Sequence, residues 1–249
     1  MESDQKGLFI VFEGIDGSGT STQVHELSRR IESLDKYQDI MRTHEPWRSA
    51  DIKRRLQEDR DAYSDPEEMS RLFVADRVDH SYRLIIPNID ANAIVISSRY
   101  KMSTCAFQQA QGVPIETLLK MHGYNNGILT PDITFFLDVP REVASERMRR
   151  RGDPSEKFER NAEFIDKVVA NYRDLVSLAQ RDSDLFGKVL RIDATKSVKE
   201  VSEEVYQDFL SVYRTWKGLD FHWSSLLRYP KADTTIDHHY QQKPEGDYQ

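Results

Sequence analysis

Hydrophobic residues gather in five short runs that are nearly continuously apolar and rich in Val, Ile and Phe. The runs are Leu8–Phe12, Asp39–Thr43, Ala93–Ser97, Asp132–Val139 and Lys188–Ile192. A strand with one solvent-facing side alternates apolar and polar residues, whereas a strand covered by helices on both faces is apolar throughout. The pattern therefore predicts five buried strands of a parallel sheet.

Between these runs, apolar residues recur every three to four positions, which is the spacing of one helix face. This spacing predicts helices over Thr20–Leu34, Pro66–Ile86, Ile115–Met121, Arg141–Arg150, Ala162–Ala179 and Val198–Tyr213. Strands that alternate with helices form βαβ units. We expect one α/β domain over residues 1–214. Residues 215–249 lack a period, and we expect a partly disordered C-terminal extension there.

A glycine-rich segment joins the first predicted strand to the first predicted helix. It reads Phe-Glu-Gly-Ile-Asp-Gly-Ser-Gly-Thr-Ser-Thr-Gln over residues 12–23. In this setting glycines let backbone N–H groups turn inward, and the helix N-terminus adds positive potential. The segment predicts a P-loop in a three-layer α/β/α fold. A glycine-rich turn without a ligand is the alternative.

The predicted P-loop supplies candidate ligands for ATP and Mg²⁺. The residues expected to bind ATP are Gly14, Gly17, Ser18, Gly19, Thr20, Ser21 and Thr22. The hydroxyl of Ser21 is placed to bind Mg²⁺, and the carboxylate of Asp16 is the second candidate ligand of the metal.

Composition limits the cellular compartment and the kinds of partner that we expect for the protein. The chain has 249 residues, a net charge of −7 and a single cysteine, Cys105. One cysteine excludes a disulfide within the chain and argues against a cysteine-based zinc site. The N-terminus does not resemble a signal peptide, and no apolar run approaches the roughly 18 residues of a membrane span. We expect a cytoplasmic protein that binds neither membranes nor, given its acidic balance, nucleic acid.

Further segments occur in the order found in the thymidylate kinase family. They are residues 12–19, 43–46, 72–77, 96–108, 131–139 and 156–159, followed by Phe164 and Tyr172. Each segment is short, but their ordered coincidence resembles this family of P-loop nucleoside monophosphate kinases. The resemblance implies Mg²⁺-dependent transfer of the ATP γ-phosphoryl group to dTMP. It also implies a homodimer and a mobile lid near Arg149–Glu159.

A nucleoside monophosphate needs an aromatic face, an amide and cations, and the resemblance suggests which residues supply them. Phe73 would stack on the base, although its spacing alone is typical of ordinary core. Arg77 would reach the base edge or the acceptor phosphate from the same helix face. Gln108 matches the thymine O4 and N3–H edge, and Phe107 would crowd a ribose 2′-OH.

Five charged residues complete the predicted acceptor site. Arg99, at the carboxyl end of the third strand, would grip the acceptor phosphate bidentately, unless it forms a structural ion pair. Asp16 would accept a hydrogen bond from the 3′-OH, and both residues are catalytic candidates. Glu45 lies in the turn before Arg48, which resembles a phosphate-binding arginine. Asp174 would lie near the sugar. For Arg48 and Asp174 a solvent-exposed surface role is the alternative.

The sequence departs from the family pattern at two positions. Thr20 replaces the P-loop lysine, and Ser98 replaces the aspartate that normally precedes Arg99. Three arginines, Arg149, Arg150 and Arg151, are further catalytic candidates, and one or two of them would fold over ATP and supply the missing charge. Alternatively, they only complement a helix dipole.

These departures keep two other functions open. One is a nucleotide-binding protein without catalysis. The other is a kinase for a related monophosphate such as dUMP.

Overall fold

The structure of the 249-residue chain is a computed structural model. It describes residues 6–58, 65–123, 127–152 and 162–219. The chain divides into two compact units, residues 1–209 and 210–249, and the first unit carries everything discussed below. Most of the predicted C-terminal extension lies outside the described residues, so the predicted boundary after residue 214 stays a prediction.

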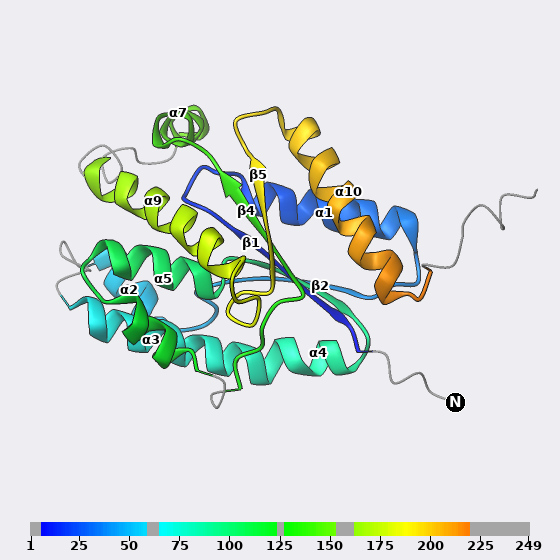
Figure 1. Cartoon of the computed structure of the whole chain (residues 1–249), viewed down its shortest axis with the longest axis horizontal. Helices are drawn as coiled ribbons and strands as arrows, with labels where there is room; N and C mark the ends of the chain where they lie inside the picture. Colours follow the sequence, from blue (N-terminus) through cyan, green and yellow to red (C-terminus); the bar gives the residue numbers. More distant parts are fainter. Residues whose placement is uncertain (1–5, 59–64, 124–126, 153–161, 220–249) are drawn as a thin grey trace, which may run out of the picture. The chain divides into compact units, whose positions relative to one another are not determined.

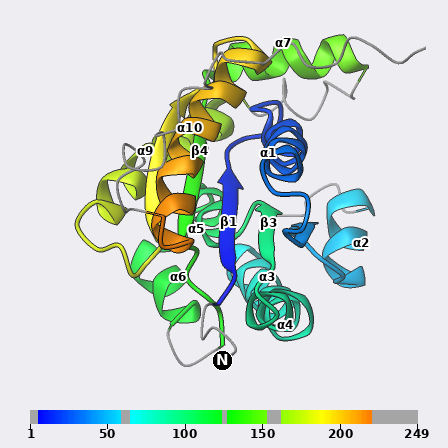
Figure 2. The ribbon, with the colours of Figure 1, turned by 90° about the vertical axis from the view of Figure 1, so that its right-hand side faces the viewer.

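Five parallel strands form the sheet of the first unit. They are β1 (Leu8–Glu13), β2 (Ile40–His44), β3 (Ile94–Ser98), β4 (Ile133–Asp138) and β5 (Lys188–Asp193). Their order is β2-β3-β1-β4-β5, which places β1 at the centre (Figure 2). Every residue of β1, β3 and β4 is buried. The predicted parallel sheet is confirmed, and each strand begins and ends within one residue of its predicted bounds.

Helices cover both faces of this sheet (Figure 1). On one face lies α1 (Thr20–Leu34), which meets the first turns of α10 (Val198–Trp216) through an ion pair of 2.9 Å between Arg30 and Glu203. The other face carries α5 and α9. The three-layer α/β/α fold is therefore confirmed. The helices between α1 and α10 are α2 (Ala50–Glu58), α3 (Pro66–His80), α4 (Ile86–Asp90), α5 (Lys101–Ala110), α6 (Ile115–Met121), α7 (Arg141–Arg151) and α9 (Ala162–Ala179).

Three helices differ from the prediction made from apolar spacing, and one of them is α5, which that spacing did not predict. The helix predicted over Pro66–Ile86 runs on to Asp90, as α3, a π-helical turn at Ser81–Ile85 and α4. The turn precedes Pro87, which has no N–H to continue the regular ladder. The short helix α2 was not predicted from its apolar spacing, because Ile52 and Leu56 are the only apolar residues of its charged segment after Ala50.

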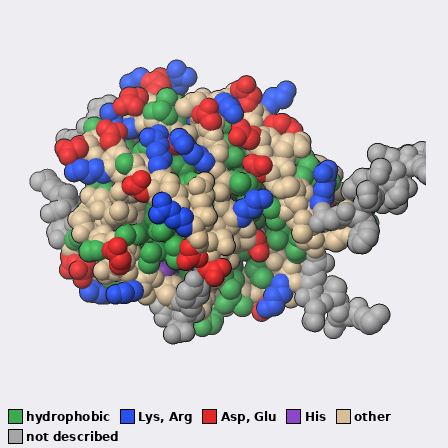
Figure 3. Space-filling view, viewed as in Figure 1, with side chains coloured by type: hydrophobic (Ala, Val, Ile, Leu, Met, Phe, Trp, Pro, Cys, Tyr) green, Lys and Arg blue, Asp and Glu red, His purple; other side chains and the backbone are tan. Residues whose placement is uncertain are grey.

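Charges of both signs are interspersed on the face of the molecule shown in Figure 3. Among the described residues, none of the helices has both the length and the apolar character that crossing a bilayer requires.

The turn before β5 makes a stability prediction. Gly187 has φ +74°, and an added Cβ would lie 1.9 Å from the carbonyl oxygen of Pro131. Gly112 has φ +99° but would meet no described atom within 4 Å. Both Gly→Ala variants carry left-handed strain. Gly187→Ala also carries a backbone clash, so we expect it to lose about 1–3 kcal/mol more unfolding free energy. Urea denaturation of the two variants measures this difference, and equal losses would contradict it.

Candidate active site

Three loops meet at the carboxyl edge of the sheet, because parallel strands all end on the same side. Ser98 at the end of β3 lies opposite Phe12 of β1 and His44 of β2. The glycine-rich loop after β1, the turn after β2 and the residues after β3 are therefore neighbours. These loops carry most of the predicted site residues.

At two glycines of the glycine-rich loop, neighbouring atoms lie so close that no other residue would fit. A Cβ on Gly17 would lie 2.4 Å from the carbonyl oxygen of Ala144, and one on Gly14 would lie 2.6 Å from Ser18 Oγ. The buried Ser18 Oγ has no hydrogen-bond partner among the described residues. The loop leads through Gly19 directly into α1, whose N-terminal N–H groups favour an anion. Thr20, Ser21 and Thr22 form the first turn of α1.

Beside this loop lies a cavity of about 210 Å³ that opens to solvent. Seven of the nine predicted acceptor residues line it, namely Asp16, Glu45, Phe73, Arg77, Arg99, Phe107 and Gln108. Pro46, Leu56, Tyr100, Ser103 and Thr104 complete the lining. Residues that are far apart in the sequence thus come together as one site.

Gln108 is the most informative polar group of the cavity. Its side chain is 1% exposed, and its Oε1 has no hydrogen-bond partner among the described residues. A buried amide oxygen without a partner costs about 1–3 kcal/mol, so such groups are normally satisfied by protein, water or ligand. Phe73, on the same cavity wall, is only half-buried. An apolar ring and an unsatisfied amide suit a nucleobase.

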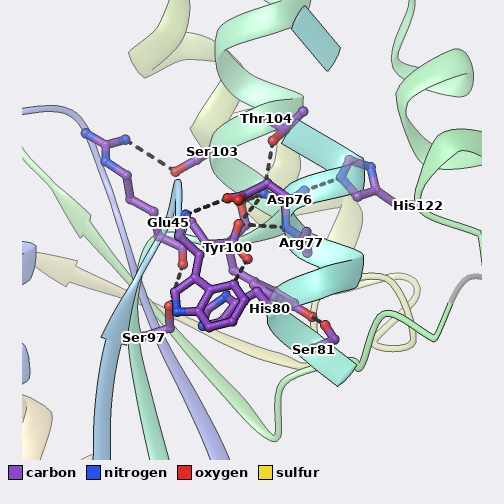
Figure 4. Close-up of polar contacts among 12 residues, drawn as sticks. Glu45, Asp76, Arg77, His80, Ser81, Ser97, Tyr100, Ser103, Thr104 and His122 are labelled. Carbon is purple, nitrogen blue, oxygen red and sulfur yellow. Dashed lines mark hydrogen bonds and ion pairs between the residues drawn. The ribbon is translucent and has the colours of Figure 1, made fainter. Parts of the chain in front are cut away.

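Arg77 belongs to the cavity wall, where its side chain is held in a buried polar network (Figure 4). Its side chain is 1% exposed and donates to Glu45 Oε2 from Nε at 2.8 Å and from Nη2 at 2.5 Å. Nη2 also lies 3.0 Å from the carbonyl oxygen of Tyr100 and 3.1 Å from Thr104 Oγ1. Arg77 therefore supports the cavity, and its predicted contact with the acceptor stays a prediction.

A histidine completes the bonding of this guanidinium. His122 Nε2 lies 2.5 Å from Arg77 Nη1, and His122 Nδ1 lies 2.7 Å from the carbonyl oxygen of Leu118. Burial and, less strongly, Arg77 hold the pKa of His122 well below its ordinary value. The neutral ring accepts from Arg77 through Nε2 and donates to Leu118 through Nδ1.

Helix α3 also holds the turn that follows β2. The carboxylate of Asp76 accepts from three consecutive backbone N–H groups, those of Trp47, Arg48 and Ser49, at 2.5, 2.9 and 2.8 Å. The indole of Trp47 stacks on His80 with ring centroids 5.1 Å apart. This tertiary anchor, together with the hydroxyl of Ser49 that accepts from Ile52 N at 3.2 Å, explains why α2 begins where it does.

Arg99 connects the glycine-rich loop to the cavity. Its guanidinium forms an ion pair with Asp16, lies 3.3 Å from Ser103 Oγ and packs 5.3 Å from the ring centroid of Phe107. The backbone of Arg99 has φ +72°, which is uncommon outside glycine and turns the side chain toward the loop. The two catalytic candidates Asp16 and Arg99 are thus direct neighbours.

Two predicted acceptor residues are not among the cavity residues. Arg48 is exposed, with its guanidinium 4.7 Å from the ring centroid of Trp47. Asp174 lies on an exposed face of α9. Lys101, which follows the acceptor motif, is 5% exposed and donates to Thr130 Oγ1 at 3.3 Å. It does not line the cavity either. Burial, reinforced by Arg77, lowers the pKa of Lys101 to about 8.

The predicted lid arginines lie at the end of α7. Arg149 and Arg150 are exposed and pair with Glu146 of the same helix, and Arg151 is the last residue of α7. Arg147 reaches the glycine-rich loop instead. It donates to the carbonyl oxygen of Ala194 at 2.7 Å and lies 3.5 Å from that of Ser18. Most of the predicted lid falls outside the described residues, so its closure over ATP stays a prediction.

A glycine-rich loop that opens a helix therefore lies beside a cavity lined with aromatic, amide and cationic side chains, and Arg99 lies between them. This pairing of a donor loop with an acceptor cavity defines the P-loop nucleotide kinases. The sequence model of the thymidylate kinase family matches residues 12–205. The chain belongs to the thymidylate kinase family.

Curated relatives agree with this assignment over nearly their whole length. The thymidylate kinase of Desulfotalea psychrophila is 33% identical over 206 residues, covering 82% of this chain and 94% of the relative. That of Kosmotoga olearia is 31% identical over 204 residues, covering 82% and 95%. A probable thymidylate kinase of Thermococcus onnurineus is 34% identical over 207 residues, covering 80% and 95%.

The buried ion pair in the cavity wall makes a second stability prediction. Arg77→Ala would leave the carboxylate of Glu45 buried and uncompensated, which costs about 3–5 kcal/mol of unfolding free energy. Arg71→Ala is the matched control, since Arg71 pairs with Glu67 at 3.0 Å with both side chains more than half exposed. It should cost no more than about 1 kcal/mol. Chemical denaturation compares them, and similar losses would show that the pair does not support the cavity.

Proposed function

We propose that this protein transfers the γ-phosphoryl group of Mg²⁺–ATP to dTMP, giving ADP and dTDP. The observation that carries the proposal is the buried Oε1 of Gln108, which has no hydrogen-bond partner among the described residues and lies in a cavity also lined by Phe73 and Arg99. Membership of the thymidylate kinase family supports ATP as the phosphoryl donor and dTMP as the acceptor.

In this proposal each side of the site holds one nucleotide. The loop from Gly14 to Gly19 and the N-terminus of α1 bind the ATP phosphates with backbone N–H groups. Phe73 and Gln108 bind the base of dTMP, and Arg99 binds its phosphate. The acceptor is already an anion, so the protein needs no general base. Catalysis then consists of positioning the two phosphates and neutralising their charge.

Magnesium fits the residues that the loop offers. Ser21 and Asp16 are exposed and carry hydroxyl and carboxylate oxygens, the ligand type that Mg²⁺ prefers. The described residues contain no group of three His, Cys, Asp or Glu able to hold a metal. Mg²⁺ that arrives with ATP does not require one, since it keeps several waters and phosphate oxygens. When bound, it neutralises charge on the β- and γ-phosphates.

The two departures from the family pattern bear on activity. Thr20 provides no cation, and Ser98, which is 8% exposed at the end of β3, provides no anion. Losing one charge of each sign leaves the local balance unchanged. The retained acceptor cavity favours an active enzyme, because a protein without catalysis would not require base recognition. Catalytic silence and a dUMP kinase are the competing functions.

An ADP-release assay against a panel of nucleoside monophosphates tests the proposal. We expect turnover with dTMP well above that with cytidine and purine monophosphates, because Gln108 matches the O4 and N3–H edge that thymine and uracil share. Membership of the thymidylate kinase family leads us to expect turnover with dTMP above that with dUMP as well. Turnover should stop when EDTA removes Mg²⁺. A different preferred acceptor would refute the substrate assignment. Binding of both nucleotides without ADP release would show that catalysis has been lost.

The lid arginines can be tested separately. If one of Arg149, Arg150 and Arg151 supplies the charge that Thr20 lacks, its Ala variant should lose at least about tenfold in kcat. Arg29→Ala is the control, because Arg29 is also exposed and paired with a glutamate of its own helix, Glu26, at 2.8 Å. Steady-state kinetics of the four variants decide the point. Three lid variants as active as the control would refute this role.

The proposal also includes a homodimeric state and a cytoplasmic location. Resemblance to the thymidylate kinases supports a homodimer, which light scattering of the purified protein measures. The single cysteine, Cys105, is buried and free, which suits a reducing compartment such as the cytoplasm.

A further inference from the structure

A buried carboxylate stands at the junction of the donor and acceptor sides. Glu13 is the last residue of β1, is 0% exposed and directly precedes the glycine-rich loop. Its Oε1 accepts from the backbone N–H groups of Tyr100 at 2.8 Å and Ser103 at 3.2 Å. Burial raises the pKa of Glu13, and hydrogen bonding to Ser103 and the charge of Arg99 oppose that rise.

The second oxygen of Glu13 reaches two hydroxyl groups. Oε2 accepts from Ser103 Oγ at 2.5 Å and from the phenol of Tyr172 at 3.2 Å. Tyr172 belongs to α9 and stacks on Phe136 of β4 with ring centroids 5.1 Å apart. One carboxylate therefore contacts the start of α5 and the middle of α9 from the end of β1.

These contacts form a closed series of interactions between the glycine-rich loop and Arg99. Ser103 Oγ, which donates to Glu13, accepts from Arg99 Nη1 at 3.3 Å. Arg99 forms an ion pair with Asp16, which lies three residues after Glu13 in the glycine-rich loop. The loop is thus joined to Arg99 twice, once through Asp16 and once through Glu13 and Ser103. The first connection is exposed at Asp16, whose side chain is 59% exposed, whereas the second begins at Glu13, which is 0% exposed.

We propose that Glu13 is a positioning residue that holds the glycine-rich loop at a set distance from Arg99. Under the proposed function, on which this inference rests, that distance separates the donor phosphate from the acceptor phosphate. Phosphoryl transfer depends on the alignment of these groups, and a displacement of about 1 Å can cost roughly 100-fold in rate.

Two substitutions test separately whether the length of the Glu13 side chain or its charge matters. In Glu13→Gln, the amide oxygen can still accept from both backbone N–H groups. The amide nitrogen can donate to the hydroxyls of Ser103 and Tyr172, because hydroxyl groups can also accept. The contacts survive but the charge does not. Glu13→Asp keeps the charge but is one methylene shorter, so it cannot span the same contacts.

The experiment measures the spacing of the two sites independently of turnover. We would measure the affinities of ATP alone, of dTMP alone, and of adenosine and thymidine joined 5′ to 5′ through five phosphates. Glu13→Asp should bind each single nucleotide within about threefold of wild type. It should bind the joined compound at least tenfold more weakly, because joint binding depends on geometry. Its kcat should fall about 100-fold.

Glu13→Gln should keep the affinity for the joined compound and at least about a tenth of kcat. Asp132→Asn is the structural control, since Asp132 accepts from Phe9 N at 2.7 Å at the opposite end of β1. We expect Asp132→Asn to leave both kcat and the affinity for the joined compound unchanged. If Glu13→Asp does not fold, Ser103→Ala takes its place, because it removes the bridge to Arg99 while both backbone N–H groups stay bonded to Glu13.

Three results would overturn the inference. Glu13→Gln as impaired as Glu13→Asp would show that retaining the contacts of Glu13 does not preserve the spacing, so reach alone would not explain its role. Glu13→Asp, or Ser103→Ala in its place, behaving like Asp132→Asn would show a purely structural role. Loss of affinity for only one single nucleotide would assign Glu13 to that subsite. Wild-type protein that binds the joined compound but never releases ADP would refute the proposed function and leave the spacing comparison intact.

Discussion

The ion pair between Arg77 and Glu45 is the interaction on which the acceptor side of the site depends. Two charges that are 1% and 5% exposed can be tolerated only if hydrogen bonds satisfy both groups. This requirement explains why His80, His122 and Thr104 surround the pair. Because Arg77 is on α3 and Glu45 follows β2, the pair holds α3 against the sheet edge. The cavity wall formed by α3 follows from this placement.

The donor side is organised by close backbone contact. The glycine-rich loop lies directly against the backbone of α7 at Ala144, and Arg147 of the same helix donates to carbonyl oxygens of that loop and of the turn after β5. Helix α7 leads toward the predicted lid. The loop that would hold ATP is therefore braced by the helix whose end carries the lid arginines. Arg147 thereby places one positive charge beside a loop that lacks the usual lysine.

The sequence predictions were accurate for features that depend on local patterns and inaccurate for features that depend on contacts between distant residues. Buried strands were predicted within one residue because a continuous apolar run is a local signal. Helix α2 was missed because Asp76 and Ser49 hold its start, and neither contact has a periodic signature. Arg48 and Asp174 were proposed by the same resemblance as Arg99 but do not line the cavity, because resemblance identifies a residue and not the direction in which it points.

The sequence by itself determined the class of fold, the place of the glycine-rich loop and the family, because apolar spacing and glycine spacing are patterns within short stretches of chain. The tertiary structure alone decided which polar residues are buried together. Glu13 and Ser103 are 90 positions apart, and Glu45 and Arg77 are 32 apart. No local pattern distinguishes such a carboxylate from one on the surface. The cost of removing its charge from water is met only by partners that folding brings from other elements.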